Sequence, residues 1–177
     1  WLTKYMALVP EKIKFQYVAG EIHHVFGKAY PLQVFLGPRD EAGLSPGGEL
    51  QLILRTEQSD REAIFKEGMK RILLLEIVQC LKTWTKRMAI PESRITGVTI
   101  HVMKSRWGSC RRVTGRFSFA LDLVTKPKEC IEAVIVHELC HLFAAGHGPD
   151  FYARMETYLP DYKERDRLLA SLPRELV

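Results

Sequence analysis

The spacing of two histidines, His137 and His141, constrains the fold of this chain more than any other feature of its sequence. The segment around them predicts a helix, because Pro127 can begin one and apolar residues then recur at helical spacing. The residues expected on its buried face are Ile131, Val134, Ile135, Leu139 and Leu142. Residues four apart are separated by about 400° of helical rotation, so both imidazoles project from one face, one turn apart. This geometry lets two ring nitrogens reach one Zn²⁺ at about 2.0–2.1 Å.

Glu138 completes an H-E-x-x-H pattern with these histidines. It sits beside the first ligand and is poorly placed to be a ligand itself, but it can take a proton from a zinc-bound water. A catalytic zinc site needs three protein ligands and one open position for water. His147 is the first candidate for the third ligand, and Glu156, on a later predicted helix, is its rival.

His147 can reach the same ion only if the chain turns back after the helix. On a continued helix it would lie about 9 Å beyond His141 and about 120° off its face. Gly146 can adopt the left-handed conformation that ends a helix and reverses the chain. Gly148 and Pro149 add further stop signals, so we expect the helix to end near Gly146.

The remaining sequence predicts an α+β fold. Alternating or short apolar runs predict strands at residues 12–18, 32–36, 50–54, 97–102 and 117–121. Residues 37–48 hold prolines and glycines and are expected to form a loop or hairpin end. The last two predicted strands are expected to form a hairpin-like pair with an elaborate connection. Two short helices are expected at residues 150–158 and 161–172.

The longest predicted helix follows residue 58 and should back the core. Ser59 or Asp60 can cap its start, and Pro91 is expected to end it. The apolar residues at near-helical spacing are Ile64, Ile72, Leu75, Val78, Leu81, Trp84 and Met88. We expect a β-rich extension over residues 1–57 and a catalytic domain over residues 58–177, which can together form one compact unit.

Composition narrows the class of protein. Hydrophobic residues make up 46% of the 177 residues and charged residues 27%, which is typical of a soluble globular chain. No apolar run approaches the roughly 18–20 residues that span a bilayer. The four cysteines, Cys80, Cys110, Cys130 and Cys140, form no C-x-x-C pair. We therefore expect reduced thiols in a cytoplasmic protein without a membrane anchor, and the roles of Cys110 and Cys140 stay open.

The net charge of +5 is mild, with one basic cluster: Lys104, Arg106, Arg111, Arg112 and Arg116. Nucleic-acid binders more often carry a denser basic stripe with interleaved aromatic residues. A nucleic-acid partner is therefore not favoured, whereas the cluster is consistent with an anionic substrate bound nearby. His23, His24 and His101 lack metal-ligand spacing, and we interpret them as ordinary residues.

Residues 104–110 (KSRWGSC), together with HELCH at 137–141, His147 and Phe151-Tyr152, resemble the YgjP-like metallopeptidase family, relatives of SprT-type and WLM-type zincins. Gly20-Glu21 and residues 160–162 extend the resemblance over nearly the whole chain. It implies a zincin-like α+β core, made of a backing helix, a small mixed sheet and an active-site helix, with an N-terminal β-rich extension. It further implies that His137, His141 and His147 hold one Zn²⁺ per chain and that Glu138 is the general base.

The same resemblance implies that Arg106, Trp107 and Gly108 lie on or near the rim of the cleft, and Tyr152 is a further candidate for substrate binding. Two departures from related patterns stand out. Ala120 stands where members commonly carry an asparagine on the strand before the active-site helix. Ala144 stands where metzincins of the same ligand spacing carry a glycine, and Met155 lies on a predicted helix rather than in a methionine turn.

Three functions remain open. The leading one is a zinc metallopeptidase, in which a substrate strand pairs with the edge of the small sheet. The second is a metal-dependent nucleoside triphosphate pyrophosphatase, since the guanidinium groups of the basic cluster can donate paired hydrogen bonds to phosphate oxygens. The third is a non-catalytic zinc-stabilised module for nucleic acid, in which Glu138→Gln would leave function intact. Arg106, Tyr152 and Tyr158 are candidate oxyanion donors, although a structural role is the simpler interpretation for each.

Overall fold

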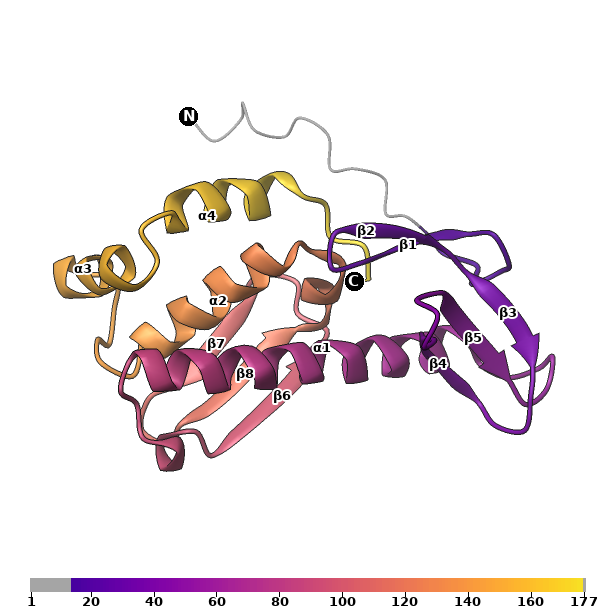
Figure 1. Ribbon diagram of the computed structural model, residues 1–177, viewed down its shortest axis with the longest axis horizontal. Helices are drawn as coiled ribbons and strands as arrows, with labels where there is room; N and C mark the ends of the chain where they lie inside the picture. The colour runs from indigo at the N-terminus through magenta and orange to yellow at the C-terminus, as the bar shows by residue number, and fades with distance from the viewer. Residues whose placement is uncertain (1–13, 177) are drawn as a thin grey trace.

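A computed structural model describes residues 14–176 and has the α+β organisation expected from the sequence (Figure 1). Its first part holds a hairpin of β1 (Ile22–Val25) and β2 (Lys28–Pro31). A three-stranded sheet follows, made of β3 (Gln33–Leu36), β4 (Glu41–Leu44) and β5 (Leu50–Leu54). In this sheet β5 is central, parallel to β3 and antiparallel to β4. The predictions at 32–36 and 50–54 are thus confirmed to within a residue.

Two predictions in this part are wrong. Residues 37–48 are not all loop, because β4 pairs with β5 there and buries Ala42. The strand at residues 12–18 partly lies outside the described residues, and residues 14–18 form no strand. The backbone N–H groups of Gln16 and Tyr17 donate instead to the Glu21 carboxylate, at 2.8 and 2.7 Å. Tyr17 also has a φ of 56°, which interrupts an extended chain.

The backing helix is α1 (Arg61–Arg87). Asp60 is the N-cap, and its carboxylate accepts from the Ala63 backbone N–H at 3.0 Å. The helix ends before Pro91, because Met88 closes the last turn and Ala89 takes a φ of 51°. Its buried residues are Phe65, Gly68, Met69, Leu73, Ile77, Leu81, Trp84 and Thr85. The predicted face was therefore partly wrong, since Leu75 is 74% exposed and Val78 37% exposed.

This helix contacts both of the three-stranded sheets among residues 14–176 (Figure 1). Its first half packs on β4 so closely that a Cβ on Gly68 would lie 2.3 Å from the Ala42 carbonyl oxygen. Its later part packs against β6 (Gly97–His101), the 3-10 helix η2 (Leu121–Thr125) and α2 (Lys128–Cys140). One hydrophobic cluster includes residues from both parts, and a domain boundary after residue 57 stays a prediction.

The second sheet contains β6 (Gly97–His101), β7 (Gly108–Arg111) and β8 (Arg116–Ala120), in the order β6-β8-β7. A 3-10 helix, η1 (Glu92–Arg94), precedes it. The expected hairpin-like pairing of residues 97–102 with 117–121 is wrong, because β6 runs parallel to β8. Parallel neighbours need a crossover, and β7, formed within that connection, makes the actual hairpin with β8. Leu121 belongs to η2 rather than to a strand.

The last three helices, α2, α3 (Pro149–Tyr158) and α4 (Tyr162–Ser171), form the part of the fold that follows η2. The buried helix α2 contacts α1, α3, α4 and β7. The two short helices predicted from the sequence are confirmed to within about a residue at each end. The expected set of a backing helix, a small mixed sheet, a helix carrying the histidine motif and an N-terminal β-rich part is therefore present.

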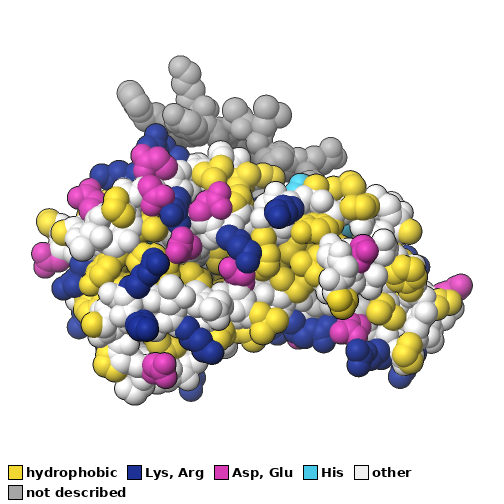
Figure 2. All heavy atoms as spheres, viewed as in Figure 1, with side chains coloured by type: hydrophobic (Ala, Val, Ile, Leu, Met, Phe, Trp, Pro, Cys, Tyr) yellow, Lys and Arg dark blue, Asp and Glu magenta, His cyan; other side chains and the backbone are white. Residues whose placement is uncertain are grey.

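The surface carries charges of both signs. On the face shown in Figure 2, Lys and Arg side chains are interspersed with Asp and Glu side chains. This face therefore lacks the single-sign field that typifies a nucleic-acid-binding surface. None of the helices among residues 14–176 combines the length and the apolar character that a membrane crossing requires.

Candidate active site

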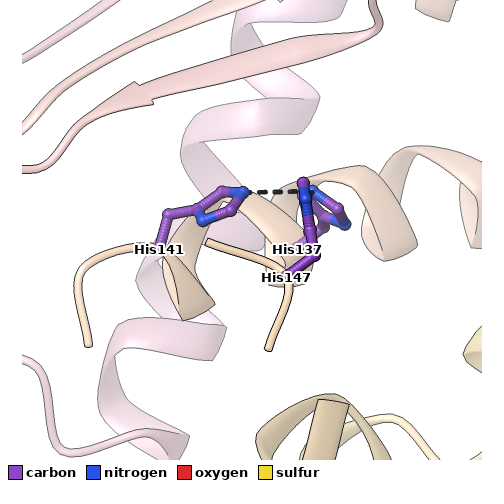
Figure 3. A group of neighbouring side chains, drawn as sticks. All are labelled: His137, His141 and His147. Atoms are coloured by element: carbon purple, nitrogen blue, oxygen red, sulfur yellow. Dashed lines mark hydrogen bonds between the residues drawn. The ribbon is translucent and has the colours of Figure 1, made fainter. Parts of the chain in front are cut away.

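Three histidine side chains converge at the end of α2 (Figure 3). The Nε2 atom of His137 lies 3.2 Å from that of His141 and 3.0 Å from that of His147. Nitrogens bound to one Zn²⁺ at about 2.0–2.1 Å in tetrahedral geometry lie roughly 3.3 Å apart. The spacing of these donors, and their chemistry, therefore fit a zinc ion.

The chain brings His147 to this point by a route that differs from the predicted one. The helix ends at Cys140, well before Gly146, and the backbone N–H groups of Phe143 and Ala144 both donate to the Cys140 carbonyl. Gly146 does not take the left-handed conformation; the described glycines with positive φ are Gly20, Gly27, Gly48 and Gly115. The turn that begins at His141 thus performs the reversal that was assigned to the glycine.

Phe151 supports all three histidines from α3. Its ring is buried, and its centroid lies 4.8 Å from the ring centroids of His137, His141 and His147. No role was predicted for this residue. The signals that could have indicated it were its place in the Phe151-Tyr152 pair of the family resemblance and its position four residues after His147.

The environment of His137 and His141 favours their neutral forms. Burial, together with the neighbouring rings of His141 and His147, lowers the pKa of His137 to about 4. Burial also lowers the pKa of His141. The Nδ1 atom of His141 lies 3.3 Å from the Ala144 carbonyl oxygen, and donation there leaves the Nε2 lone pair free for a metal.

Glu138 lies beside this group and is 5% exposed. Burial raises the pKa of its carboxyl to about 7, although the Arg106 charge and the Cys110 backbone N–H act in the opposite direction. A Cβ on Gly108 would lie 2.7 Å from Oε1 of Glu138, so β7 packs directly against the carboxyl group. A carboxyl poised near neutral pH can both accept and return a proton.

A cleft of about 720 Å³ opens over these groups. Its lining residues are Arg106, Trp107, Gly108, Ser109, Cys110, Arg112, Val113, Val134, His137, Glu138, His141, Ala145, His147, Asp166 and Leu169. The predicted rim residues Arg106, Trp107 and Gly108 are therefore all at the cleft. Within β7, Ser109 faces the opposite side of the sheet from Gly108 and Cys110, yet all three line the cleft. The cleft thus runs along the edge of this strand.

The other residues singled out from the sequence lie elsewhere. Tyr152 is 44% exposed and does not line the cleft, although its ring centroid lies 6.4 Å from that of His147. Tyr158 is half-buried and also outside the lining. Glu156 is exposed and pairs with Lys163 at 2.9 Å rather than with the histidines. Ala120 is buried at the end of β8.

Both cysteines near the site are free thiols. Burial and the Glu138 carboxylate raise the pKa of Cys110 to about 11. Burial raises the pKa of Cys140 to about 11 as well. Both are therefore protonated thiols at neutral pH, and neither belongs to the group of three histidines that could hold a metal.

A family model described as "YgjP-like, metallopeptidase domain" matches residues 1–172. The chain belongs to the YgjP-like metallopeptidase family. Membership of the YgjP-like family supports a metallohydrolase that uses a divalent metal, typically zinc. No curated protein matches the chain at a significant level.

Two solved structures of archaeal proteins are similar to part of this YgjP-like chain. One is the metallopeptidase zymogen of Pyrococcus abyssi abylysin, 21% identical, covering 57% of this chain and 99% of its own, with a TM-score of 0.48. The other is the metallopeptidase zymogen of Methanocaldococcus jannaschii jannalysin, 21% identical, covering 54% and 88% respectively, with the same TM-score. Both matches cover little more than half of the chain, and its assignment rests on the family model.

Proposed function

We propose that the chain is a zinc metallopeptidase in which His137, His141 and His147 hold one metal ion and Glu138 is the general base. The observation that carries this proposal is the convergence of three imidazole Nε2 atoms next to a buried carboxyl group on the wall of one cleft. The family supports a hydrolase, and this geometry supplies the residues.

The three histidines would bind the metal ion, and the surrounding residues orient the imidazole rings. Phe151 packs against all three rings, and the Ala144 carbonyl fixes the tautomer of His141. A zinc ion, when bound, supplies a Lewis acid that makes a water more acidic and polarises the carbonyl under attack. Three protein ligands would leave one position for the water or the substrate.

Glu138 moves the proton. At neutral pH its carboxyl, with a pKa raised by burial to about 7, is partly ionised and can take a proton from a water in the cleft. The same carboxyl group then carries the proton that the leaving amine needs. Gly108 leaves the space that this side chain occupies, because a Cβ there would lie 2.7 Å from Oε1 of Glu138.

Strand β7 offers a binding edge for an extended peptide. Within the described part of the chain its only paired neighbour is β8, and its free side runs along the cleft. A substrate strand can therefore add to this edge through main-chain hydrogen bonds, with its side chains meeting the cleft walls. Arg106 lines the cleft close enough to affect the Glu138 charge, which makes it the best-placed of the three oxyanion donors considered.

One observation favours a second candidate, the hydrolysis of a phosphoanhydride. Arg106 and Arg112 both line the cleft. One guanidinium group can donate two parallel hydrogen bonds to phosphate oxygens. The second candidate uses the same metal site and the same Glu138. It differs in the substrate that the arginines would bind, such as a nucleoside triphosphate.

The test uses purified zinc-loaded protein and a mixed library of unstructured peptides, with products analysed by mass spectrometry. We expect the unmodified protein to cleave peptides and Glu138→Gln, with zinc still bound, to be inactive. Glu156→Gln is a matched control, because this glutamate is exposed and paired with Lys163. If no peptide is cleaved but a nucleoside triphosphate is hydrolysed in parallel, the second candidate replaces the first. Unchanged function in Glu138→Gln would instead indicate a non-catalytic zinc module.

A further inference from the structure

Trp107 lines the cleft, and Arg174, which does not line it, lies over the Trp107 ring. The guanidinium carbon of Arg174 lies 3.8 Å from the centroid of the Trp107 ring. The same guanidinium donates to the Met103 carbonyl oxygen at 2.6 Å. Arg174 therefore contacts both ends of residues 103–107, the segment that leads into β7.

Residues 173–176 are themselves fixed on η2. The fully buried Asp122 carboxylate accepts from the backbone N–H groups of Glu175 and Leu176, at 2.8 and 2.7 Å. The buried Lys126 ammonium donates to the Pro173 carbonyl oxygen and lies 3.6 Å from the Glu175 carboxylate. Glu175 also contacts His24 at 3.0 Å, which agrees with the course of the chain end beside β1 and β2 (Figure 1).

Charge explains why this segment stays in place. Asp122 and Lys126 are 0% and 1% exposed in their side chains, and a buried ion that loses its partner is strongly unfavourable. Oδ2 of Asp122 has no hydrogen-bond partner in the described part of the chain, and the nearest cation is Arg174, at 4.0 Å. The segment thus provides the backbone donors and the cation that the Asp122 carboxylate requires.

We propose that residues 173–176 form a clamp that sets the position of the substrate-binding wall, with Arg174 as the positioning residue that holds Trp107. This inference rests on the proposed peptidase function. Arg174 does not line the cleft, so it acts through Trp107 and not on the substrate. Its loss should therefore weaken peptide binding while leaving the histidines and Glu138 unaffected.

The experiment compares Arg174→Ala, Arg174→Lys, Trp107→Ala and the double variant Arg174→Ala/Trp107→Ala in the full zinc-loaded chain. Three quantities are measured: KM and kcat for a cleaved peptide, zinc affinity by chelator competition, and amide hydrogen exchange of residues 103–107. Arg167→Ala is the matched control, because Arg167 is exposed and pairs with Glu164 on α4.

For Arg174→Ala we expect KM to rise about tenfold, which corresponds to the loss of a partly desolvated guanidinium–ring contact. We expect kcat and zinc affinity to change less than about twofold. Exchange at residues 103–107 should become faster, and Arg167→Ala should show none of these changes. The double variant should be no worse than Trp107→Ala alone, because Arg174 acts through that ring. Arg174→Lys keeps a positive charge beside Asp122 and should recover only part of the substrate affinity that Arg174→Ala loses.

Unchanged KM together with unchanged exchange at residues 103–107 in Arg174→Ala would overturn the proposal. So would an equal loss of zinc affinity and substrate affinity in Arg174→Lys, because that pattern indicates a general structural role. If the unmodified protein cleaves no peptide, the proposed function fails. In that case the exchange comparison still decides whether Arg174 holds residues 103–107.

Discussion

Gly108 and Glu138 are in contact across the boundary between the second sheet and α2. A Cβ on Gly108 would lie 2.7 Å from Oε1 of Glu138 and 2.8 Å from its Cγ. The strand that borders the cleft and the helix that carries the motif are therefore fitted together at the proposed general base. The glycine that follows Arg106 and Trp107 thus has a physical explanation, since any side chain there would occupy the space of the carboxyl group.

Gly108→Ala should therefore displace the Glu138 carboxylate from its position in the cleft. We expect kcat to fall by at least about tenfold, because a general base that is displaced by even a short distance loses its alignment with the proton. Zinc affinity should change much less, since the three heavy atoms nearest to the added Cβ all belong to Glu138. Gly97→Ala is the control, because a Cβ there would meet only the Arg116 Cγ atom, at 4.0 Å. Equal activities of the two variants would show that the contact is unimportant.

Glu138→Gln removes the proton acceptor without changing the size of the side chain. General acid–base catalysis contributes typically about 10²–10⁴-fold, so kcat should fall by at least about 10²-fold. Zinc content, measured by atomic emission on the purified variant, should remain at the level of the unmodified protein. Loss of zinc in Glu138→Gln would mean that this carboxylate holds the metal, contrary to the proposed role.

His147→Ala tests the third ligand. Loss of a residue that merely orients a ligand costs about 10–100-fold in metal affinity, so loss of a ligand should cost at least about 100-fold. Chelator competition measures the affinity, and we expect His101→Ala and Glu156→Ala to bind zinc as the unmodified protein does. If Glu156→Ala lowered the zinc affinity more than His147→Ala, Glu156 and not His147 would be the third ligand. This outcome would be surprising, because Glu156 pairs with Lys163.

Features set by neighbouring residues in the chain could be predicted from the sequence. Helical geometry alone placed His137 and His141 on one face, and the Asp60 carboxylate caps α1 as its residue type predicts. The two short helices after His147 were also predicted closely, because Pro149 and Pro160 mark their limits.

Features set by contacts between distant segments could not be predicted. The phase of α1 was ambiguous because residues 72–75 are four consecutive apolar residues, so more than one helical stripe passes through them. The tertiary contacts with η2 and α2 select the stripe that includes Leu73. Similarly, no local signal shows that β6 pairs in parallel with β8. Nor does any local signal show that the backbone N–H groups of Gln16 and Tyr17 donate to the Glu21 carboxylate and not to a neighbouring strand.

His23 gives the fold a dependence on pH that is independent of the metal. It is 2% exposed, packs against Phe15 and Phe65, and contacts Glu21 at 2.9 Å. Burial lowers the pKa of His23, although the Glu21 carboxylate acts in the opposite direction. The folded protein therefore binds this proton less readily than the unfolded chain, where the pKa is about 6.5. The stabilisation is complete above that pH and is lost as the pH falls through the lowered pKa of the folded state.

We expect the free energy of unfolding of the metal-free protein to fall as the pH decreases below about 6.5. His23→Gln keeps a polar partner for Glu21 but cannot titrate, so its unfolding free energy should depend less on pH in this range. Urea unfolding at a series of pH values measures both proteins, and the difference between their slopes isolates His23 from His137 and His141. The Glu21 carboxyl, whose pKa is lowered by hydrogen bonds from Gln16 and Tyr17 against the effect of burial, adds a second loss of stability below about pH 4.5 in the unmodified protein. Parallel slopes between pH 6.5 and 5 would show that His23 does not titrate in the folded and unfolded states as its burial predicts.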